Sequence, residues 1–372
     1  MVSCQYVKIP GFPAREHYPG IPMSATVAPS SANRDKHGAR RPAREGDRSL
    51  VDSFARRIDY LRVSVTDRCD LRCQYCLPED FKGFEEPANW LTHVEMARLI
   101  GLFVDLGVSK IRLTGGEPLT RRGVAELAAR VAAMPDVRDL AMSTNGTRLA
   151  RYAADLKQAG VRRLNVSLDS LDAETFREIT RRDRLQDVLD GLQEARRVGF
   201  ESIKVNCVVH SQTPEEEVAR ILGYTLDNGF ILRLIETMPL GASGQQFRHV
   251  NLNEMGARLA TRFGLLHTIE HVGPGPARYW SAEGKSPALG VITPMSQHFC
   301  ASCNRVRLSV DGTLYLCLGQ ENQVPLGAAL RQGADDAELQ RLILAGIAAK
   351  PERHEFVTAP RRIIRVMAQT GG

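Results

Sequence analysis

The sequence lacks any long hydrophobic run. No segment reaches the roughly 18 apolar residues that would span a bilayer, and none has the apolar core of a secretory signal peptide. A membrane protein is therefore not expected, and neither is a secreted protein held together by disulfides. We expect a protein of the cytoplasm, where a reducing environment keeps thiols free.

Strong net charge is also missing from most of the chain. The formal net charge is +6 and the pI is about 8.9, values that would suit a nucleic-acid partner. Residues 1–50, however, hold 8 Lys/Arg and 4 Asp/Glu, so they account for four of the six net charges and the remainder is nearly neutral. A broad basic face for a phosphate backbone is not indicated, and we expect no nucleic-acid partner.

Residues 1–52 show no regular pattern. They are rich in Pro, Ser, Ala and Arg and have neither the period of a helix nor that of a strand. We predict a disordered N-terminal extension that the chemistry does not need.

From about residue 58 to residue 240, short β-branched runs alternate with helical patterns. The predicted strands are Tyr60–Val65, Val108–Leu113, Val137–Met142, Val161–Leu168, Ser202–Val209 and Ile231–Ile235. Thr92 and Glu95 have the spacing of a capping box before a helix over Val94–Leu106, and Thr213 and Glu216 repeat it before Val218–Asp227. Six strand–helix units predict an α/β fold with a partial (βα)6 parallel barrel over residues 53–240. An open doubly wound sheet is the alternative.

After residue 240 this alternation stops. Glycine-rich loops and strands predicted at Ala288–Thr293, Asn304–Val310 and Thr313–Leu318 indicate a smaller β-rich region over residues 241–372. A helix is predicted from about Asp335 to Ala349.

Six of the eight cysteines form two triplets, Cys69-x3-Cys73-x2-Cys76 and Cys300-x2-Cys303-x13-Cys317. Three thiolates can hold three irons of a 4Fe–4S cluster and leave the fourth iron open to a small molecule. The alternative is a zinc site of Cys73, Cys76, Cys300 and Cys303, which would leave Cys69 and Cys317 without a role. The count therefore favours two clusters. Cys4 and Cys207 are interpreted as thiols that bind no metal.

Polar motifs follow five of the six predicted strands. They are the first cysteine triplet, Gly115-Gly116-Glu117-Pro118, Ser143-Thr144-Asn145-Gly146, the pair Ser167 and Asp169, and Met238. The carboxyl ends of parallel strands meet at one face of a barrel, so these motifs predict a single site.

Four segments together carry a resemblance to a known family. LRVSVTDRCDLRCQYCLPED at residues 61–80 has the cysteine spacing of the radical S-adenosylmethionine (SAM) enzymes, with the aromatic Tyr75 before the third cysteine. With RLTGGEPL at 112–119, NVSLD at 165–169, HFCASCNRVRLSVDGTLYLCL at 298–318 and the terminal Gly371-Gly372, the chain resembles the GTP 3′,8-cyclases, the first enzymes of molybdenum cofactor biosynthesis. The resemblance covers about residues 55–372.

The resemblance implies two 4Fe–4S clusters, SAM as cofactor and GTP as substrate. The cluster on Cys69, Cys73 and Cys76 would chelate SAM and pass it one electron, and the resulting 5′-deoxyadenosyl radical would abstract hydrogen from C3′ of GTP. The free iron of the second cluster would bind the guanine base. Attack of C3′ on C8 and a reduction would give (8S)-3′,8-cyclo-7,8-dihydroguanosine 5′-triphosphate.

The resemblance also implies roles for single residues. SAM contacts fall on Tyr75, Gly116, Ser167 and Met238, and GTP contacts on Arg62, Arg112, Ser143, Lys204, Arg305, Val306 and Arg307. Catalytic roles fall on Arg233, Gly371 and Gly372. Arg62, Arg112 and Lys204 lie in strand-like runs, where an inward-facing charge is costly unless it meets a ligand. Ser143 stands where the family more often has Thr, which keeps the hydroxyl.

The implied partners are a low-potential electron donor of flavodoxin or ferredoxin type, the next pathway enzyme, cyclic pyranopterin monophosphate synthase, and a second copy of the chain in a homodimer. Two alternatives remain. One is another radical SAM enzyme with auxiliary clusters, against which the CNRVR segment at 303–307 and the Gly-Gly end argue. The other is a zinc-stabilised α/β binding module.

Overall fold

The computed structural model of the protein describes residues 49–77, 87–268, 275–282, 286–360 and 363–371. Leu50 is buried in the core, and its carbonyl accepts the Ile58 N–H at 2.7 Å. Asp52 forms a buried ion pair with Arg56 at 2.6 Å. Residues 49–52 therefore belong to the folded unit, which corrects the predicted end of the extension at residue 52. The rest of that extension lies outside the described residues, as does Cys4.

The described strands form one twelve-stranded sheet. Its order is β12-β11-β10-β1-β2-β3-β4-β5-β6-β9-β8-β7. The strands are β1 (Tyr60–Ser64), β2 (Lys110–Thr114), β3 (Asp139–Thr144), β4 (Arg163–Ser167), β5 (Ser202–Val209), β6 (Ile231–Glu236), β7 (Leu266–Thr268), β8 (Arg278–Ser281), β9 (Pro287–Ile292), β10 (Arg305–Leu308), β11 (Thr313–Tyr315) and β12 (Gln323–Pro325).

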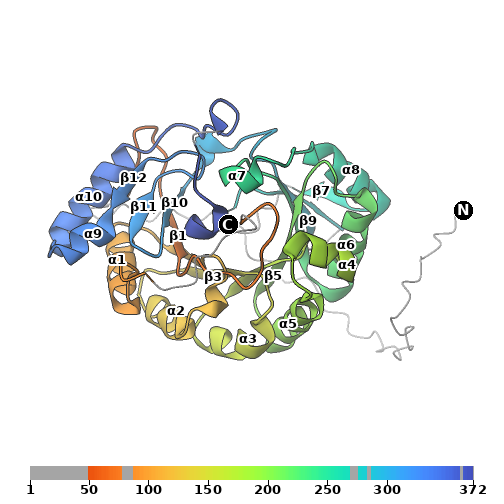
Figure 1. Ribbon diagram of the computed structural model, residues 1–372, viewed down its shortest axis with the longest axis horizontal. Coiled ribbons are helices and arrows are strands. Elements are labelled where there is room, and N and C mark those ends of the chain that lie inside the picture. The colour runs from red at the N-terminus through yellow and green to blue at the C-terminus, as the bar shows by residue number, and fades with distance from the viewer. Residues whose placement is uncertain (1–48, 78–86, 269–274, 283–285, 361–362, 372) are drawn as a thin grey trace, which may run out of the picture. The chain divides into compact units, whose positions relative to one another are not determined.

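The sheet has a parallel centre and antiparallel edges. Strands β1 to β6 pair in parallel and in sequence order, as predicted. Strand β10 adds to β1 and β9 adds to β6, also in parallel, so the region after residue 240 continues the sheet on both sides. Antiparallel partners follow at each edge. Figure 1 shows the strands curving around a central space, so the sheet is the predicted partial barrel.

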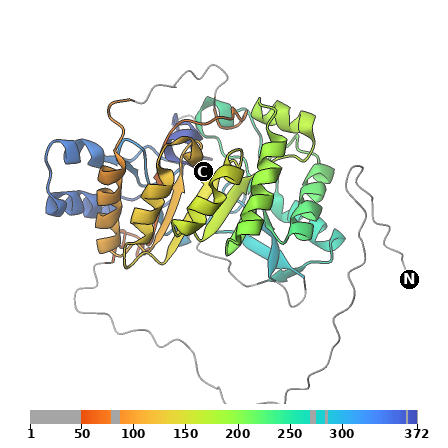
Figure 2. The same ribbon diagram turned by 90° about the horizontal axis from the view of Figure 1, so that it is seen from below.

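Helices cover the outer side of the curved sheet (Figure 1), and Figure 2 shows those between β1 and β6 lying side by side. The helices are α1 (His93–Asp105), α2 (Val124–Ala132), α3 (Leu149–Gln158), α4 (Ala173–Thr180), α5 (Leu185–Val198), α6 (Glu215–Asn228), α7 (Gly241–Gly244), α8 (Leu252–Arg262), α9 (Leu326–Arg331), α10 (Asp336–Ala348) and α11 (Met367–Thr370), with short 3₁₀ helices η1 (Pro118–Thr120) and η2 (Cys300–Ser302). None of the described helices has both the length and the apolar composition needed to cross a bilayer.

The two predicted capping boxes have different outcomes. Before α1, the Thr92 hydroxyl accepts the Glu95 N–H at 3.2 Å and the Glu95 carboxylate accepts the Thr92 N–H at 2.7 Å, which confirms the first box. Before α6, the cap is Pro214 and no side chain caps the helix. The Thr213 hydroxyl instead accepts the His210 N–H at 3.1 Å, because the chain turns there after β5. The prediction of a capping box at Thr213 and Glu216 was therefore wrong.

The core lies between the helices and the outer face of the sheet. Helix α1 buries Met96, Leu99, Ile100 and Phe103 at helical spacing. In β1, Leu61 and Val63 join this core while Tyr60 and Arg62 alternate with them and line the inner cavity. The period of two thus separates an apolar outer face from a polar inner face, and the inner face provides the site.

Candidate active site

Both cysteine triplets line one cavity on the inner side of the sheet. Cys69, Cys73 and Cys76 face it from the loop after β1, and Cys300, Cys303 and Cys317 face it from loops on either side of β10 and β11. The motifs after β2, β3, β4 and β6 contribute Gly115, Gly116, Ser143, Ser167 and Met238 to the same cavity. The motifs therefore converge on one cavity, as predicted.

The first cysteine loop is held by α4 and by its own turn. The Arg72 N–H donates to the Thr180 carbonyl at 2.9 Å, and the Gln74 N–H donates to the Ile179 carbonyl at 3.0 Å. The Cys76 N–H donates to the Cys73 carbonyl at 2.9 Å. These bonds fix the backbone of the loop that carries the three thiols.

Burial is the largest influence on the pKa of each of these three thiols. It raises the pKa of Cys69 and Cys73 well above the ordinary value and that of Cys76 to about 12. Nearby Glu117 adds to the increase for Cys69, and Asp169 adds to it for Cys73. Thiols of this kind stay protonated until a metal replaces the proton.

The cysteines fit clusters better than a zinc ion. Within the described ranges, no three His, Cys, Asp or Glu side chains converge on the position of one metal ion. A four-cysteine zinc site needs such convergence, whereas a 4Fe–4S cluster binds each thiolate through a different iron. Polar donors also reach the first triplet, since the Leu71 N–H lies 3.4 Å from the Cys69 sulfur.

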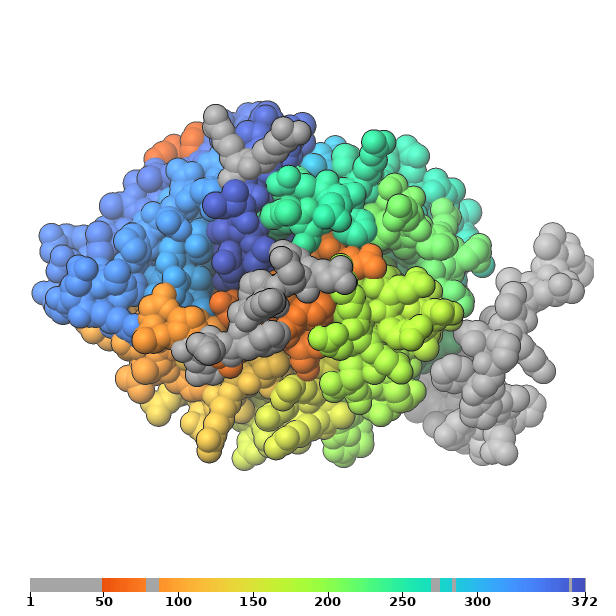
Figure 3. Space-filling view, viewed as in Figure 1, coloured from red at the N-terminus to blue at the C-terminus, as the bar shows by residue number. Residues whose placement is uncertain are grey.

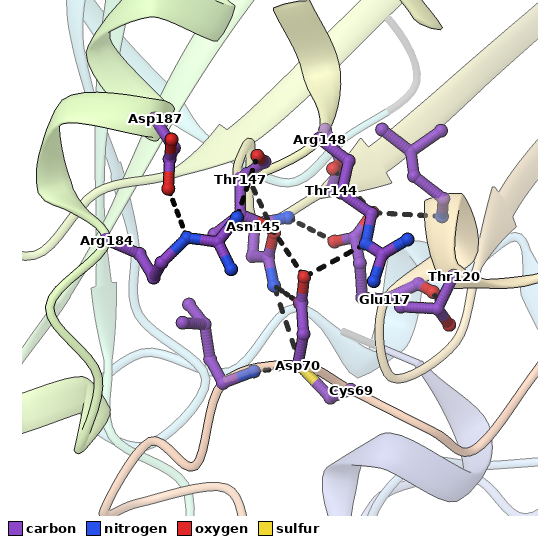
Figure 4. A network of polar contacts seen from close by, with 12 residues as sticks. Cys69, Asp70, Glu117, Thr120, Thr144, Asn145, Thr147, Arg148, Arg184 and Asp187 are labelled. Atoms are coloured by element: carbon purple, nitrogen blue, oxygen red, sulfur yellow. Dashed lines mark hydrogen bonds and ion pairs between the residues drawn. The ribbon is translucent and has the colours of Figure 1, made fainter. Parts of the chain in front are cut away.

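A polar network behind Cys69 connects the first three strand ends (Figure 4). The Asn145 amide donates to Asp70 at 2.8 Å and to the Cys69 sulfur at 3.6 Å. The Thr147 N–H donates to the Asn145 side-chain oxygen at 3.0 Å, which leaves the amide NH2 to face Cys69. The Thr147 hydroxyl and Arg148 both donate to Asp70. Asn145 is thereby fixed as a hydrogen-bond donor to the Cys69 thiol.

Glu117 is the buried acid of this network. Its carboxylate accepts the Asn145 N–H at 2.6 Å, the Thr144 hydroxyl at 2.7 Å and the Leu119 N–H at 3.0 Å. Burial raises its pKa to about 7 even though these donors lower it. The carboxylate ties η1 to the end of β3 and sets the edge of the cavity.

The glycines before Glu117 are required by the protein's own backbone. A Cβ on Gly115 would lie 2.3 Å from the Thr66 carbonyl oxygen, and one on Gly116 would lie 2.2 Å from that of Arg68. The Gly116 N–H donates to the Thr66 carbonyl at 2.8 Å. The close approach that requires these glycines is therefore to the cysteine loop of the chain itself.

Tyr75 and Asp169 form a second contact between the cysteine loop and a strand end. The Tyr75 hydroxyl donates to Asp169 at 2.6 Å, and the other carboxylate oxygen accepts the Val208 N–H at 2.8 Å. Burial raises the pKa of Asp169 to about 6 against the effect of these donors. Asp169 thus orients Tyr75, and both Tyr75 and Ser167 line the cavity.

The second triplet is held by residues distant in sequence. Arg56 donates to the carbonyls of Cys300 at 2.9 Å, Pro351 at 2.7 Å and Glu352 at 2.6 Å. Lys350 donates from Nζ to the Leu316 carbonyl, next to Cys317. Although burial raises the pKa of Cys303, the charges of Lys350 and Arg305 outweigh it, and the net shift is downward.

Three arginines lie side by side across the inner face of the sheet. The register pairs Arg62 of β1 with Arg307 of β10 on one side and with Arg112 of β2 on the other. Arg112, Arg305 and Arg307 are at most 8% exposed. Burial, and then repulsion from Arg62, lowers the pKa of Arg307, and burial lowers that of Arg112 to about 9.

These arginines have no anionic partner in the described part of the chain. No described carboxylate lies within ion-pair distance of Arg62, Arg112, Arg305 or Arg307, and the Nε of each is buried without a hydrogen bond. The Ser143 hydroxyl, in the same cavity, also has no partner. Like charges in adjacent positions and unpaired buried donors are both unfavourable, so this surface is suited to an anionic ligand.

The remaining predicted residues take other positions. Arg233 lines the cavity and donates to Asn206 at 2.9 Å and to Asn165. Lys204 lies two residues before Asn206 on β5, is 4% exposed, and does not line the cavity, with its ammonium 5.9 Å from the Tyr279 ring centre. The Val306 side chain points the other way, into the hydrophobic core, so only its backbone is available to a ligand on the inner face.

The C-terminal segment reaches into the centre of the barrel. The dark-blue end of the chain lies on the inner side of the sheet in Figure 1 and fills the space beside the green segment around α7 in Figure 3. Gly371 is buried with φ of 69°, and a Cβ there would lie 2.2 Å from the Thr114 side chain at the cavity edge. Arg365 anchors the segment through the Leu318 carbonyl at 3.1 Å and Glu321 at 2.7 Å. Gly372 lies outside the described residues.

Several site residues were missed from the sequence. Asn165 and Asn206 orient Arg233, and Arg56 and Lys350 hold the second triplet. Alternation along β4 and β5 places Asn165 and Asn206 on the inner face, which would have been a usable signal. Arg56 and Lys350 precede and follow the sheet, and nothing local distinguishes them from surface residues.

A partial parallel barrel with three cysteines in the loop after its first strand defines a radical SAM protein, and the comparisons agree. The Radical SAM superfamily model matches residues 63–224 and the Molybdenum Cofactor Synthesis C model matches residues 230–356. Among solved structures, Streptococcus suis SuiB bound to S-adenosylmethionine aligns with a TM-score of 0.55 at 14% identity, over 77% of this chain and 67% of that one. SuiB bound to its precursor peptide SuiA aligns with 0.56 at 14% identity, over 79% and 65%. These structures support the fold alone.

Similar proteins of known name identify the family within the radical SAM class. A GTP 3′,8-cyclase of Pseudomonas putida strain W619 is 46% identical over 334 residues, which cover 88% of this chain and 99% of the relative. GTP 3′,8-cyclase 2 of Pseudomonas aeruginosa is 45% identical over 331 residues, with the same coverage of 88% and 99%. The chain belongs to the GTP 3′,8-cyclase family, which confirms the resemblance found in the sequence.

Proposed function

We propose that the chain cyclises GTP to (8S)-3′,8-cyclo-7,8-dihydroguanosine 5′-triphosphate with SAM, the first step of molybdenum cofactor biosynthesis. Family membership supports the reaction. The observation that carries it is the surface of Arg62, Arg112, Arg305 and Arg307, buried and without an anionic partner among the described residues, in a cavity shared with both cysteine triplets.

The arginine surface is the proposed site for the triphosphate. GTP brings about four negative charges, and charge-assisted bonds from arginine to phosphate relieve both the repulsion between guanidiniums and the cost of unpaired donors. Ser143 would donate its free hydroxyl to the same ligand. Lys204 lies on the same face of β5 as Asn206, which lines the cavity, and would contribute its charge to the ligand from that buried position. Val306 would contribute through its backbone.

The end of the cavity that carries the first cysteine triplet is the proposed site for SAM. Cys69, Cys73 and Cys76 would hold a 4Fe–4S cluster, which, with bound SAM, supplies a one-electron cleavage that generates the radical needed at C3′ of the ribose. Tyr75, Gly116, Ser167 and Met238 would surround SAM. The carboxylates of Glu117 and Asp169 lie at this end and favour a ligand that carries an ammonium and a sulfonium.

Cys300, Cys303 and Cys317 would hold a second 4Fe–4S cluster, whose open iron would take the guanine base. With the base at one end and the phosphates on the arginines, the ribose would face the SAM end. Arg233 would act at the substrate, held in one orientation by Asn165 and Asn206. The tail through Gly371 and Gly372 would close the cavity against water, since Gly371 already contacts Thr114.

The proposal includes partners outside the chain. GTP loses a hydrogen atom at C3′ and gains an electron and a proton, so an external low-potential donor of flavodoxin or ferredoxin class must supply reducing equivalents. The product would pass to cyclic pyranopterin monophosphate synthase. We place the enzyme in the cytoplasm as a homodimer.

The decisive experiment follows an isotope, because product and substrate are isomers of equal mass. The chain is incubated anaerobically with SAM, dithionite and GTP carrying deuterium at C3′, and the 5′-deoxyadenosine is analysed by mass spectrometry. We expect deuterium in 5′-deoxyadenosine, together with a new nucleotide. GTP deuterated at C4′ is the matched control and should transfer none. Zinc near one per chain with no iron, or label transfer only from C4′, would contradict the proposal.

A further inference from the structure

Lys350 is a buried lysine that points at the second cysteine triplet. It follows helix α10, its side chain lines the cavity, and the residue is 2% exposed. Its Nζ donates to the Leu316 carbonyl, the residue immediately before Cys317. The lysine thus holds the loop that carries the last ligand of the triplet.

The ammonium has no carboxylate partner in the part of the chain that the structure describes. Within that part of the chain its ammonium donates to a neutral carbonyl, and a buried charge is costly without an opposite charge nearby. Lys350 lines the same cavity as Cys303 and Cys317, and its Nζ is bonded to the carbonyl of the residue that precedes Cys317. The anions available to this lysine are therefore the thiolates of the triplet.

Other cations near the triplet already have roles. Arg56 is paired with Asp52 and binds three backbone carbonyls. Arg305 and Arg307 belong to the surface proposed for phosphate, and the Arg305 backbone carbonyl accepts the Cys303 thiol at 4.0 Å. Lys350 alone among these four both binds the Cys317 loop and lacks another anion.

We propose that Lys350 is the counter-charge of the second cluster, a positioning residue that fixes the Cys317 loop and raises the reduction potential of the cluster bound there. The proposal rests on the proposed function in so far as Cys300, Cys303 and Cys317 hold a cluster. A positive charge beside a cluster stabilises its reduced, more negative form, so removing the charge lowers the potential.

The test isolates the second cluster. Cys69, Cys73 and Cys76 are all replaced by Ala, and the chain is reconstituted anaerobically with iron and sulfide. Iron per chain and the midpoint potential, from a redox titration followed by electron paramagnetic resonance, are measured with Lys350, with Lys350→Gln and with Lys350→Arg. Gln keeps a donor for the Leu316 carbonyl but has no charge, and Arg keeps the charge. Lys157→Gln is the matched control, because Lys157 also donates to a backbone carbonyl, that of Gly199, but on the surface.

In Lys350→Gln we expect the reduced-to-oxidised ratio at a fixed potential to fall at least tenfold, a decrease of about 59 mV for one electron. Lys350→Arg and Lys157→Gln should stay close to the parent. If Lys350→Gln loses the circular dichroism of the parent, Lys350→Ala with added propylammonium replaces it, and the cation should restore the potential.

Three results would overturn the proposal, and they are distinguishable. A parent that binds no cluster on the second triplet removes both this inference and the second cluster of the proposed function. A parent that binds the cluster, with an unchanged potential in Lys350→Gln or no response to propylammonium in Lys350→Ala, removes the inference alone. Equal loss of iron from Lys350→Gln and Lys350→Arg would also contradict it, because shape rather than charge would then be decisive.

Discussion

The two cysteine triplets line one cavity but have opposite electrostatic surroundings. After burial, carboxylates add to the increase in pKa in the first triplet: Glu117 acts on Cys69, and Asp169 acts on Cys73 after the neighbouring thiols Cys76 and Cys69. The charges that affect Cys303 come from cations, chiefly Lys350 and Arg305. The proposed ligands carry the complementary charges, since SAM has a sulfonium and an ammonium and GTP has a triphosphate. The cavity is therefore polarised, and this polarity would orient the two ligands toward each other.

The triplets also differ in how they are built. The first lies within eight residues of one loop, held by backbone bonds to α4 and by the Asn145 network. The second takes its ligands from two loops and needs Arg56 from before the barrel and Lys350 from after α10. The first triplet is a local structure, whereas the second depends on the whole folded unit.

The largest expected effect separates the chemistry of the two ends. Cys73→Ala should abolish SAM cleavage, because the first cluster loses a ligand. Cys317→Ala should abolish cyclised product but leave some cleavage of SAM to 5′-deoxyadenosine. Both products are measured by chromatography. Cys207→Ala, a buried thiol outside the cavity, is the control. Complete loss of SAM cleavage in a Cys317→Ala variant that retains the first cluster would mean that the two ends are not separable.

Changes in the C-terminal Gly371-Gly372 segment should reduce cyclisation nearly as much as loss of a cysteine does. Gly371→Ala places a methyl group against Thr114, so we expect cyclisation to fall about a hundredfold while iron content and uncoupled SAM cleavage persist. Deletion of Gly371 and Gly372 should have the same effect. Gly199→Ala is the matched control, because Gly199 has a similar φ of 80° but no atom within 4 Å of the added methyl. Full cyclase activity in Gly371→Ala would mean that the tail does not position the substrate.

The acidic end predicts a pH dependence of stability. Burial raises the pKa of Glu117 from 4.5 to about 7, so the folded chain holds this proton more tightly than the unfolded chain. Its contribution to the free energy of unfolding therefore decreases as pH rises from about 4.5 to about 7, by about 3 kcal/mol. Glu117→Gln should remove this decrease, as measured by urea unfolding of the metal-free chain. Exposed Glu126→Gln should behave like the parent, and a parallel slope in Glu117→Gln would disprove the assignment.

The cationic end predicts a loss of affinity. Arg112→Ala and Arg307→Ala each remove a charge-assisted contact worth about 1.5–3 kcal/mol, so GTP should bind roughly tenfold to a hundredfold more weakly in calorimetry. Binding of SAM should hardly change. Arg162→Ala, which removes an exposed partner of Glu201, is the control. Unaltered GTP affinity in both variants would leave the arginine surface without its proposed ligand.

The smallest effect is expected for the N-terminal extension. Deleting residues 2–48 removes no described contact and should leave cluster content and cyclisation unchanged. Deleting residues 2–56 also removes Leu50, Asp52 and Arg56, and should release the Cys300 loop and its iron while the first cluster remains. Iron per chain in the two deletions measures the difference. Loss of activity in the shorter deletion would reveal a role for the extension.

The strands of the barrel were predictable because hydrophobic alternation and helix caps are local. Predicted strands such as Ser202–Val209 match the structure, and Thr92 caps α1 as expected. Strands β7, β8 and β12 were not predicted, since they have three or four residues each and depend on their partners. The Thr213 cap failed for a related reason: the turn after β5 uses the same hydroxyl.

The sequence by itself determined the cysteine spacing, the glycines and the strand-end motifs, and these were enough for the fold class and the family. Their signals are local, because spacing along a loop or strand fixes which side chains share a face. Only the tertiary structure decided that Arg307, Arg62 and Arg112 lie side by side, that Lys204 does not line the cavity, and that Lys350 binds the Leu316 carbonyl beside Cys317. Those relations depend on the register between strands and on packing across the barrel, which residues far apart in the chain set together.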